Sequence, residues 1–297
     1  MRVLVTGASG MLGGAVVRAL MSYHSSVEIF ALRHRSSIPA GVRELSRNEL
    51  SPKRFDVIVH AASPASPVDH VKATNVIDAN VQLTNELLAT TKPNGVFVFI
   101  STGEVYGPEA GNGVGEWESI KPQMAGPRSY YPLAKVLGEN LVLSQCNVRS
   151  VVLRTFHTFG PGVRRDDGRS FADFIWGAAQ NKRIELKSDG SAVRSLLHVD
   201  DFARGVLAVM DSTVAHGIYN IGSSIPMSIL DIAKRISTIA GADLSFSSIN
   251  NPKDVSPINV LTPNVEKLES AGWRRLKGVD DIIKDTLYWI SVVNPSE

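Results

Sequence analysis

Five apolar runs, rich in β-branched residues, alternate with helical patterns in the first half of the chain, and this alternation restricts the fold more than any other feature. The runs lie at residues 2–6, 27–32, 56–61, 96–101 and 150–155. Continuous apolar runs of this length are typical of strands that are buried on both faces. The stretches between them with helical periodicity lie at 11–21, 74–91 and 129–145. We therefore predict an α/β fold with a doubly wound parallel sheet.

Shorter elements make up the second half of the chain, after a Gly-Pro-Gly turn at residues 160–162. A strand is predicted at 184–186, and helices are predicted near 171–180, 200–210, 229–240 and 279–291. We expect a first domain over residues 1–160 and a smaller lobe over residues 161–297. Part of the later chain is expected to return to the first domain.

Composition and charge exclude several classes of protein. The chain has 31 Lys plus Arg and 29 Asp plus Glu, with no basic block, so we expect no nucleic-acid partner. The first apolar run reaches Gly7 too soon for a signal peptide, and no apolar stretch is long enough to span a membrane, which favours a cytoplasmic protein. The single cysteine, Cys146, cannot form an internal disulfide and is expected to be buried. The histidines lack the spacing of metal ligands, so we predict no metal site.

The first apolar run leads directly into a glycine turn and then into a helix. Gly7, Gly10 and Gly13 have the spacing GxxGxxG. Glycines in such a turn allow a phosphate to approach closely and a helix to pack tightly on a strand, while the helix N-terminus attracts the anion. The motif indicates a dinucleotide-binding site, although a tight turn without a ligand would have the same spacing.

Two arginines follow the second apolar run, at the place where an acidic residue would bind the adenosine ribose of NAD. Arg33 and Arg35 favour the 2′-phosphate of NADP there. A solvated basic loop is the alternative, and NAD stays possible.

Tyr131 and Lys135 lie one turn apart in a predicted helix, so their side chains share one face. Tyr130 lacks this relationship, because Ala134 lies four residues after it. A cation beside a phenol favours the phenolate, so we expect Lys135 to lower the pKa of Tyr131 and make it an acid or base near neutrality. An isolated Tyr–Lys pair at this spacing is more often a surface pair.

Hydroxyl and carboxyl side chains follow the apolar run at 96–101. Ser101, Thr102 and Glu104 come at the carboxyl edge of the predicted sheet, where open α/β sheets bind their ligands. Thr102 suits a hydrogen bond to a reacting hydroxyl or carbonyl, and Glu104 suits a base. Strand-end capping and a solvent-facing charge are the respective alternatives.

Together these motifs resemble those of the extended short-chain dehydrogenase/reductase family, which includes nucleotide-sugar epimerases, dehydratases, decarboxylases and ketoreductases. The resemblance covers nearly the whole chain. It rests on the glycine turn, HAA at 60–62, Asn80, STGEVYG at 101–107, YPLAK at 131–135, Arg154 through Gly160 and Pro161, and Arg194 in VRSLLHVDD. It implies a Rossmann sheet with an NAD(P)-binding domain over residues 1–160 and a substrate lobe over residues 161–297.

The resemblance also implies roles for individual residues. Thr102 matches the catalytic Ser/Thr, Tyr131 the acid/base, and Lys135 the lysine that binds the nicotinamide ribose; Glu104 is a further catalytic candidate. The implied cofactor-binding residues, with Glu44 near the adenine, are Gly7, Ser9, Gly10, Met11, Leu12, Gly13, Arg33, Arg35, Glu44, Ala61, Ala62, Ser63, Asn80, Tyr131 and Lys135. The implied substrate-binding residues are Ser101, Thr102, His157 and Arg194, the last of which would hold a diphosphate.

Three positions depart from the family pattern. Gly103 stands where dehydratases carry Asp and sugar-acid decarboxylases carry Ser, which argues against both reactions. His157 replaces an Asn, and no arginine occurs between Lys253 and Lys267, where a second diphosphate ligand is common. Asp-Asp-Gly-Arg at 166–169 and Glu104 point the other way, toward UDP-glucuronate decarboxylases.

What the resemblance implies is an NAD(P)-dependent enzyme that transfers hydride at C4 of a nucleoside-diphosphate sugar, through a 4-keto species. A 4-keto reductase or a 4-epimerase is expected. The alternatives are a decarboxylase-like or 4,6-dehydratase-like lyase that uses Glu104, and a non-catalytic NADP-binding sensor. A homodimer is expected to form through the helices that carry Asn80 and Lys135.

Overall fold

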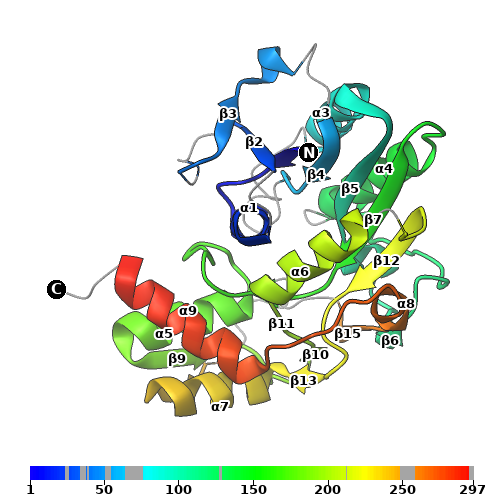
Figure 1. Ribbon diagram of the computed structural model, residues 1–297. Helices are drawn as coiled ribbons and strands as arrows, with labels where there is room; N and C mark the ends of the chain where they lie inside the picture. Colours follow the sequence, from blue (N-terminus) through cyan, green and yellow to red (C-terminus); the bar gives the residue numbers. More distant parts are fainter. Residues whose placement is uncertain are drawn as a thin grey trace.

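A seven-stranded sheet forms the centre of the molecule in the computed structural model, which describes residues 1–23, 27–33, 38, 40–50, 55–63, 76–126, 129–211, 213–247 and 258–293. The strand order is β12-β7-β5-β4-β1-β2-β3 (Figure 1), and every neighbouring pair is parallel. The strands are β1 (Arg2–Thr6), β2 (Glu28–Leu32), β3 (Arg43–Leu45), β4 (Phe55–His60), β5 (Thr91–Thr102), β7 (Arg149–Thr155) and β12 (Gly217–Ile221). The predicted α/β fold with a doubly wound sheet is confirmed.

The direction of strand succession reverses at β1, which has β2 on one side and β4 on the other. In open α/β sheets, ligands bind beyond the carboxyl ends of the strands at such a reversal. The turn after β1 and the ends of β4 and β5 therefore share the edge where a ligand is expected.

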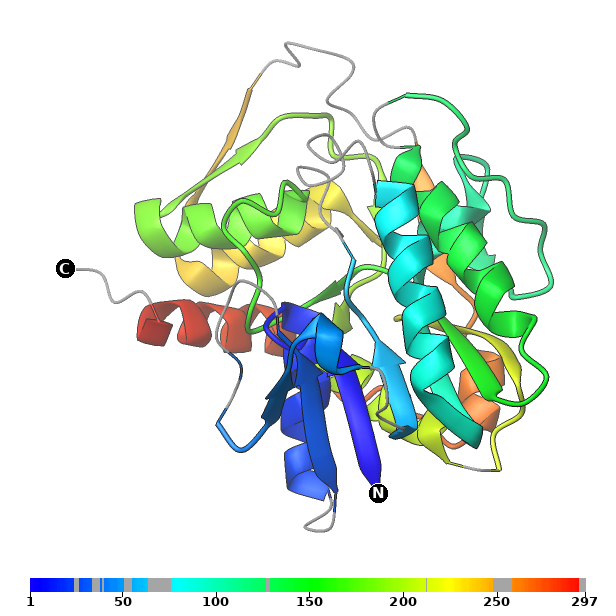
Figure 2. The same cartoon turned by 90° about the horizontal axis from the view of Figure 1, so that it is seen from above.

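Helices cover both faces of this sheet. α1 (Met11–Tyr23) packs against α6 (Val199–Met210), and α3 (Val76–Thr90) packs against α4 (Tyr130–Leu143). Figure 2 shows α3 and α4 side by side on the opposite side of the sheet from α1. The doubly covered sheet explains why its strands read as nearly continuous apolar runs.

Side chains along β1 alternate between the two faces, as the pleat of a strand requires. Val3 and Val5 lie in a core cluster with Val16 of α1 and Phe202 of α6. Leu4 lies in a second cluster, which includes residues of α3 and α4. The central strands thus bury apolar side chains in two separate layers.

A second body of helices and short strands comes mainly from the later chain. Its helices are α5 (Ser170–Asn181), α7 (Ile229–Ala240) and α9 (Val279–Val293), which share a third apolar cluster, and α8 (Glu266–Ser270) packs on β12. Its small sheets contain β6 (Gly111–Val114), β8 (Thr158–Phe159), β9 (Arg183–Leu186), β10 (Val193–Arg194), β11 (Leu197–His198), β13 (Met227–Ser228), β14 (Asp243–Phe246) and β15 (Val260–Pro263). The chain after residue 160 also returns to the large sheet through α6 and β12. The division at residue 160 stays a prediction.

Several details differ from the expectations. β3 and α8 were not predicted, and β5 begins at Thr91 rather than at residue 96. Cys146 is exposed in the turn after α4, so the expectation of a buried thiol is wrong. No helix in the described part of the chain has both the length and the apolar character to cross a bilayer. Within the same residues, no group of three or more His, Cys, Asp or Glu side chains is arranged to hold a metal ion.

Candidate active site

The turn between β1 and α1 requires its glycines. Gly7 has a φ of +70°, and a Cβ there would lie 3.0 Å from the backbone of Ala61. A Cβ at Gly13 would overlap the carbonyl oxygen of Gly7. The Gly10 amide donates to that same oxygen at 2.9 Å. The turn thus lies against the end of β4 with no room for side chains at these glycines, and α1 begins directly after it at Met11. This arrangement fits the predicted pyrophosphate cradle, to which Ser9 and Leu12 would also belong.

The end of β4 is fastened to the end of β1 beside this turn. The Thr6 hydroxyl accepts a hydrogen bond from the Ala62 amide at 3.1 Å and shares a second hydrogen bond with His60 Nδ1 at 2.8 Å. Burial and, to a smaller extent, the charge of Lys135 together lower the pKa of His60 to about 3. The neutral imidazole is thus a structural clamp, and it holds Ala61, Ala62 and the following Ser63 next to the glycine turn.

At the ends of β2 and β3 the structure joins two predicted cofactor residues. Arg33 Nε lies 3.0 Å from Glu44 Oε2. Arg35, the other predicted ligand of a 2′-phosphate, lies outside the described residues. The predicted arginine at this position is therefore already paired with a carboxylate.

Tyr131 and Thr102 meet at the carboxyl edge of the sheet. Thr102 ends β5, and its hydroxyl accepts a hydrogen bond from the Glu104 amide at 3.2 Å. Tyr131 lies in the first turn of α4 and is hydrogen-bonded to Thr102. Tyr131 is 7% exposed, whereas Tyr130 is 44% exposed. The geometry selects the same tyrosine as the helical spacing did.

Lys135 lies one turn below Tyr131 and is buried. Its Nζ donates to the carbonyl of Ile100 at 2.7 Å and lies 5.8 Å from the centre of the Tyr131 ring. Burial lowers the pKa of Lys135 to about 7, while the carboxylate of Glu139 acts in the opposite direction. The lysine therefore titrates near neutrality.

The pKa of Tyr131 is raised above its ordinary value, chiefly by burial and then by the negative charge of Glu104. The hydrogen bond from Thr102 and the positive charge of Arg169 act in the opposite direction. The expectation that Lys135 lowers this pKa is wrong for this structure. Burial dominates, and the cation that opposes it is Arg169.

Ser101 is separated from Thr102 by the pleat of β5. Its hydroxyl donates to Glu139 at 2.5 Å, and Glu139 also accepts two hydrogen bonds from Arg154, at 2.7 and 3.1 Å. All three side chains are buried. The structure thus places Ser101 in a polar network under α4 rather than with the predicted substrate-binding residues.

His157, Arg169 and Arg194 converge near Tyr131 and Glu104. Burial and then the charges of Arg194 and Arg169 lower the pKa of His157 well below its usual range, so the ring is neutral. The charge of Glu104 is felt by both arginines. His157 Nδ1 is buried, and no hydrogen-bond partner for it occurs among the described residues. The guanidinium of Arg194 donates to the backbone carbonyls of residues 193, 258 and 259 at 2.7–3.2 Å, which fix its position in the second body. Its contact with a substrate diphosphate stays a prediction.

Sequence reasoning did not single out Arg169 as a site residue. Asp167 holds its guanidinium with two hydrogen bonds, at 2.5 and 2.8 Å, and its Cζ lies 4.5 Å from the centre of the Phe159 ring. Arg169 precedes α5 in sequence, 38 residues after Tyr131, so only the tertiary fold brings the two together. The one available signal was the Asp-Gly-Arg turn at 167–169.

Asn80 lies in α3, and its side chain is buried. α3 packs along α4, which carries Tyr131 and Lys135. Contact of Asn80 with a cofactor stays a prediction.

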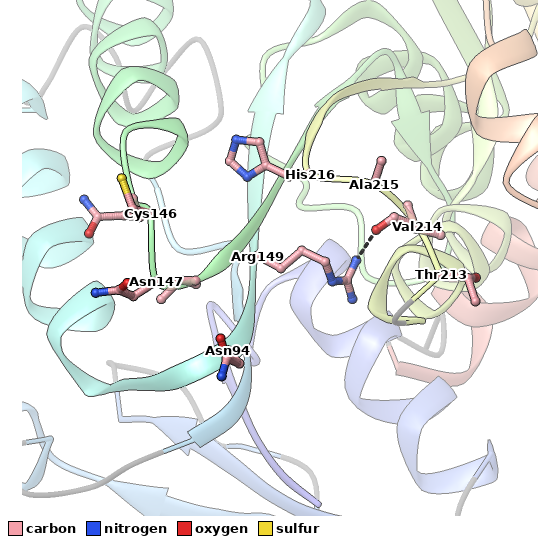
Figure 3. A pocket seen from close by; sticks show the side chains of 10 residues that line it. Asn94, Cys146, Asn147, Arg149, Thr213, Val214, Ala215 and His216 are labelled. Atoms are coloured by element: carbon pink, nitrogen blue, oxygen red, sulfur yellow. Dashed lines mark hydrogen bonds between the residues drawn. The ribbon is translucent and has the colours of Figure 1, made fainter.

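A cavity of about 680 Å³ lies at the opposite edge of the sheet, where β7 and β12 begin (Figure 3). Its lining includes Asn94, Cys146, Arg149 and His216. The guanidinium of Arg149 donates to the carbonyls of residues 209, 210 and 214 at 2.9–3.1 Å. Arg149 thus fastens the end of α6 to the start of β7. None of the predicted site residues lines this cavity, so it is separate from the candidate active site.

Comparison with known proteins identifies relatives over nearly the whole chain. Residues 3–222 match the family model described as the NAD dependent epimerase/dehydratase family. UDP-glucuronic acid decarboxylase 6 from Arabidopsis thaliana is 28% identical over 92% of this chain and 84% of its own length.

Solved structures share the fold. A UDP-glucose 4-epimerase from Thermotoga maritima, with UDP-glucose, superposes with a TM-score of 0.86 at 20% identity, over 99% of both chains. A UDP-glucuronic acid 4-epimerase from Bacillus cereus, in complex with UDP-glucuronic acid and NAD, has a TM-score of 0.83 at 21% identity and covers 99% of this chain and 100% of its own.

Proposed function

We propose, from the premise that this chain belongs to the NAD-dependent epimerase/dehydratase family, within the extended short-chain dehydrogenases/reductases, that it transfers hydride at C4 of a nucleoside-diphosphate sugar. The net reaction is reduction of a 4-keto sugar or epimerisation at C4. One observation carries the proposal: a buried phenol, Tyr131, is hydrogen-bonded to Thr102 at the sheet edge, one helical turn from Lys135.

The glycine turn supports the cofactor part of the proposal. Gly7, Gly10 and Gly13 would hold the pyrophosphate, and Lys135 would hold the nicotinamide ribose. A bound nicotinamide dinucleotide would donate or accept the hydride. Arg33 at the end of β2 favours NADP, and the partial neutralisation of Arg33 by Glu44 keeps NAD as the alternative.

Tyr131 would carry out the proton transfer. Since its pKa is raised, the phenol is protonated at neutral pH and suits the role of an acid that protonates the sugar O4 during reduction. Thr102 would hold the same oxygen through its hydroxyl. In the reverse direction Tyr131 would have to ionise, and the positive charge of Arg169 assists that step.

Gly103 supports hydride transfer without elimination. A Cβ at this position would lie 2.9 Å from three carbons of the Phe156 ring. The family members that eliminate water or carbon dioxide place a polar side chain here, and in this chain the ring fills that space.

A second candidate is a lyase, and one observation favours it. Glu104 lies near both Tyr131 and Arg169, and a carboxylate with an arginine beside it suits decarboxylation of a sugar acid, with Arg169 bound to the sugar carboxylate. The Arabidopsis relative is named as a UDP-glucuronic acid decarboxylase.

Product mass distinguishes these reactions. The purified chain is incubated with UDP-, dTDP-, GDP- and CDP-linked hexoses and hexuronic acids in the presence of NAD or NADP, and with the corresponding 4-keto hexoses in the presence of NADH or NADPH. A gain of two hydrogens supports reduction, and an unchanged mass with a changed retention time supports epimerisation. Loss of carbon dioxide or water supports the lyase. No turnover of any member of the panel, with nucleotide binding intact, would overturn the enzymatic proposal in favour of a sensor.

We also propose that two copies pair through α3 and α4. Leu137 of α4 is 45% exposed although it is apolar, and two such helices from each copy would form a four-helix interface. Light scattering coupled to size-exclusion chromatography would give twice the chain mass, and a single chain mass at micromolar concentration would contradict the pairing.

A further inference from the structure

An ion pair joins the ends of β2 and β3. Arg33 directly follows β2, Glu44 lies in β3, and Arg33 Nε is 3.0 Å from Glu44 Oε2. The two strands are in parallel register, with Ala31 opposite Glu44, and the Arg33 amide donates to the Leu45 carbonyl at 2.7 Å. The backbone therefore fixes both charged side chains at one corner of the ligand-binding edge.

This corner is where a bound dinucleotide would present its adenosine ribose, so the inference rests on the proposed function. The residue at the end of the second strand distinguishes the free 2′-hydroxyl of NAD from the 2′-phosphate of NADP. Arginine favours the phosphate, because its planar fork of N–H donors matches the phosphate oxygens. Here that arginine is shared with a carboxylate before any ligand binds.

We infer that Glu44 sets the preference of the protein between NADP and NAD, because it holds Arg33 and places a negative charge beside the 2′-phosphate position. The Arg33–Glu44 pair has no net charge, whereas a 2′-phosphate carries about two negative charges at neutral pH. Glu44 thus competes with the 2′-phosphate for Arg33, and its own negative charge repels the phosphate. Neither effect acts on the neutral 2′-hydroxyl of NAD, so Glu44 reduces the preference of the protein for NADP over NAD.

The pair is accessible to water, which limits the size of the effect. The side chains of Arg33 and Glu44 are 63% and 38% exposed. Exposed ion pairs contribute at most about 1 kcal/mol, and salt weakens them further. A change of several-fold in cofactor affinity is therefore expected, and it should shrink as salt is added.

Titration calorimetry of the full chain with NADH and NADPH tests this directly, without any need for substrate. Glu44→Gln should bind NADPH about three- to fivefold more tightly, with the affinity for NADH changed by less than about twofold. Arg33→Gln should weaken the binding of NADPH and leave the binding of NADH unchanged. In the double variant, removal of Glu44 should no longer improve NADPH binding to the same extent, since the arginine that it held is absent.

The matched control is Glu28→Gln. Glu28 pairs with Arg43 at 3.2 Å but lies at the start of β2, at the opposite edge of the sheet. This variant removes the same charge and should leave both affinities unchanged. The fragments 2′,5′-ADP and 5′-AMP, titrated in place of the whole cofactors, should reproduce the difference between NADPH and NADH.

The outcomes separate this inference from the function on which it rests. An equal loss of NADH and NADPH affinity in Glu44→Gln would overturn the inference, because it would mean that Glu44 contacts only a part common to both cofactors. An undiminished gain in the double variant would overturn the role of Arg33. If the unaltered chain bound neither cofactor, the proposed function itself would fail, and the inference with it.

Discussion

The ring of Phe156 lies in the space that a side chain at Gly103 would occupy. A Cβ at Gly103 would be 2.9 Å from Cδ1, Cε1 and Cζ of that ring. Phe156 is itself buried with Val105, Val114 and Leu261. The ring cannot move without disturbing this cluster, so glycine at 103 and phenylalanine at 156 form a matched pair.

Gly103→Ser should therefore destabilise the protein by about 1–3 kcal/mol, the usual cost of adding atoms to a packed site. Urea unfolding measures the change. Phe156→Leu in the same chain should recover part of it, because the shorter side chain makes room. Gly278→Ser is the control, since a Cβ there meets only Asp281 at 3.7 Å. Equal losses at positions 103 and 278 would contradict the pairing.

Tyr131→Phe should reduce kcat by about 10²–10⁴-fold, the usual contribution of a positioned acid or base. The affinity for the dinucleotide should change little, because the ring is retained and only the hydroxyl that meets Thr102 is lost. Steady-state kinetics with a substrate from the panel measure the first effect, and calorimetry measures the second. Tyr130→Phe, one residue earlier and facing solvent, should retain full activity; comparable losses in the two variants would rule out a special role for Tyr131.

Stability should rise with pH above neutrality because of Lys135. Its pKa is about 7 in the folded chain and near 10.5 when unfolded, so between these values the unfolded chain binds more protons. The free energy of unfolding should gain at most about 1.4 kcal/mol per pH unit across this window. Urea unfolding between pH 6.5 and 10 measures the slope of this free energy against pH. The Lys135→Met variant should lose the slope, whereas Lys284→Met, on the exposed side of α9, should keep it. An identical slope in both variants would exclude Lys135 as its source.

Glu139→Gln should cost about 3–5 kcal/mol, since it leaves the buried guanidinium of Arg154 without its counter-charge. Glu86→Gln is the matched control: Glu86 pairs with Arg47, and the two side chains are 44% and 49% exposed. Its loss should be below about 1 kcal/mol. Denaturant midpoints of the two variants give the comparison. A small loss at Glu139 would mean that Arg154 finds another partner or reaches water.

The central strands were predictable because burial on both faces leaves a nearly continuous apolar run. β3 was not, because Arg43 and Glu44 give this edge strand no such pattern. The start of β5 was missed for a different reason. Thr90 ends α3 and Thr91 begins β5 with no turn residue between them, so the helical and extended patterns merge in the sequence.

Within the site, residue spacing predicted correctly which side chains share one face of a helix. It did not predict which side chains from different elements come together. Tyr131 and Lys135 share a helix face, so four residues of separation were sufficient. Ser101 was grouped with Thr102 because they are adjacent, but adjacent residues of a strand point to opposite faces. Ser101 follows Phe97 and Phe99 toward α4. Arg169 depends on the packing of a distant loop, which no local pattern encodes.

The large sheet is completed late in the chain. β12 lies beside β7 and α6 covers α1, yet both are made from residues after 198. During synthesis, at roughly 5–20 residues per second, the N-terminal strands would wait for several seconds with an open edge at β7 and an uncovered apolar helix. The unpaired β7 edge and the uncovered face of α1 persist until the residues up to Ile221 have left the ribosome, and exposed surfaces of this kind favour chaperone binding to the nascent chain.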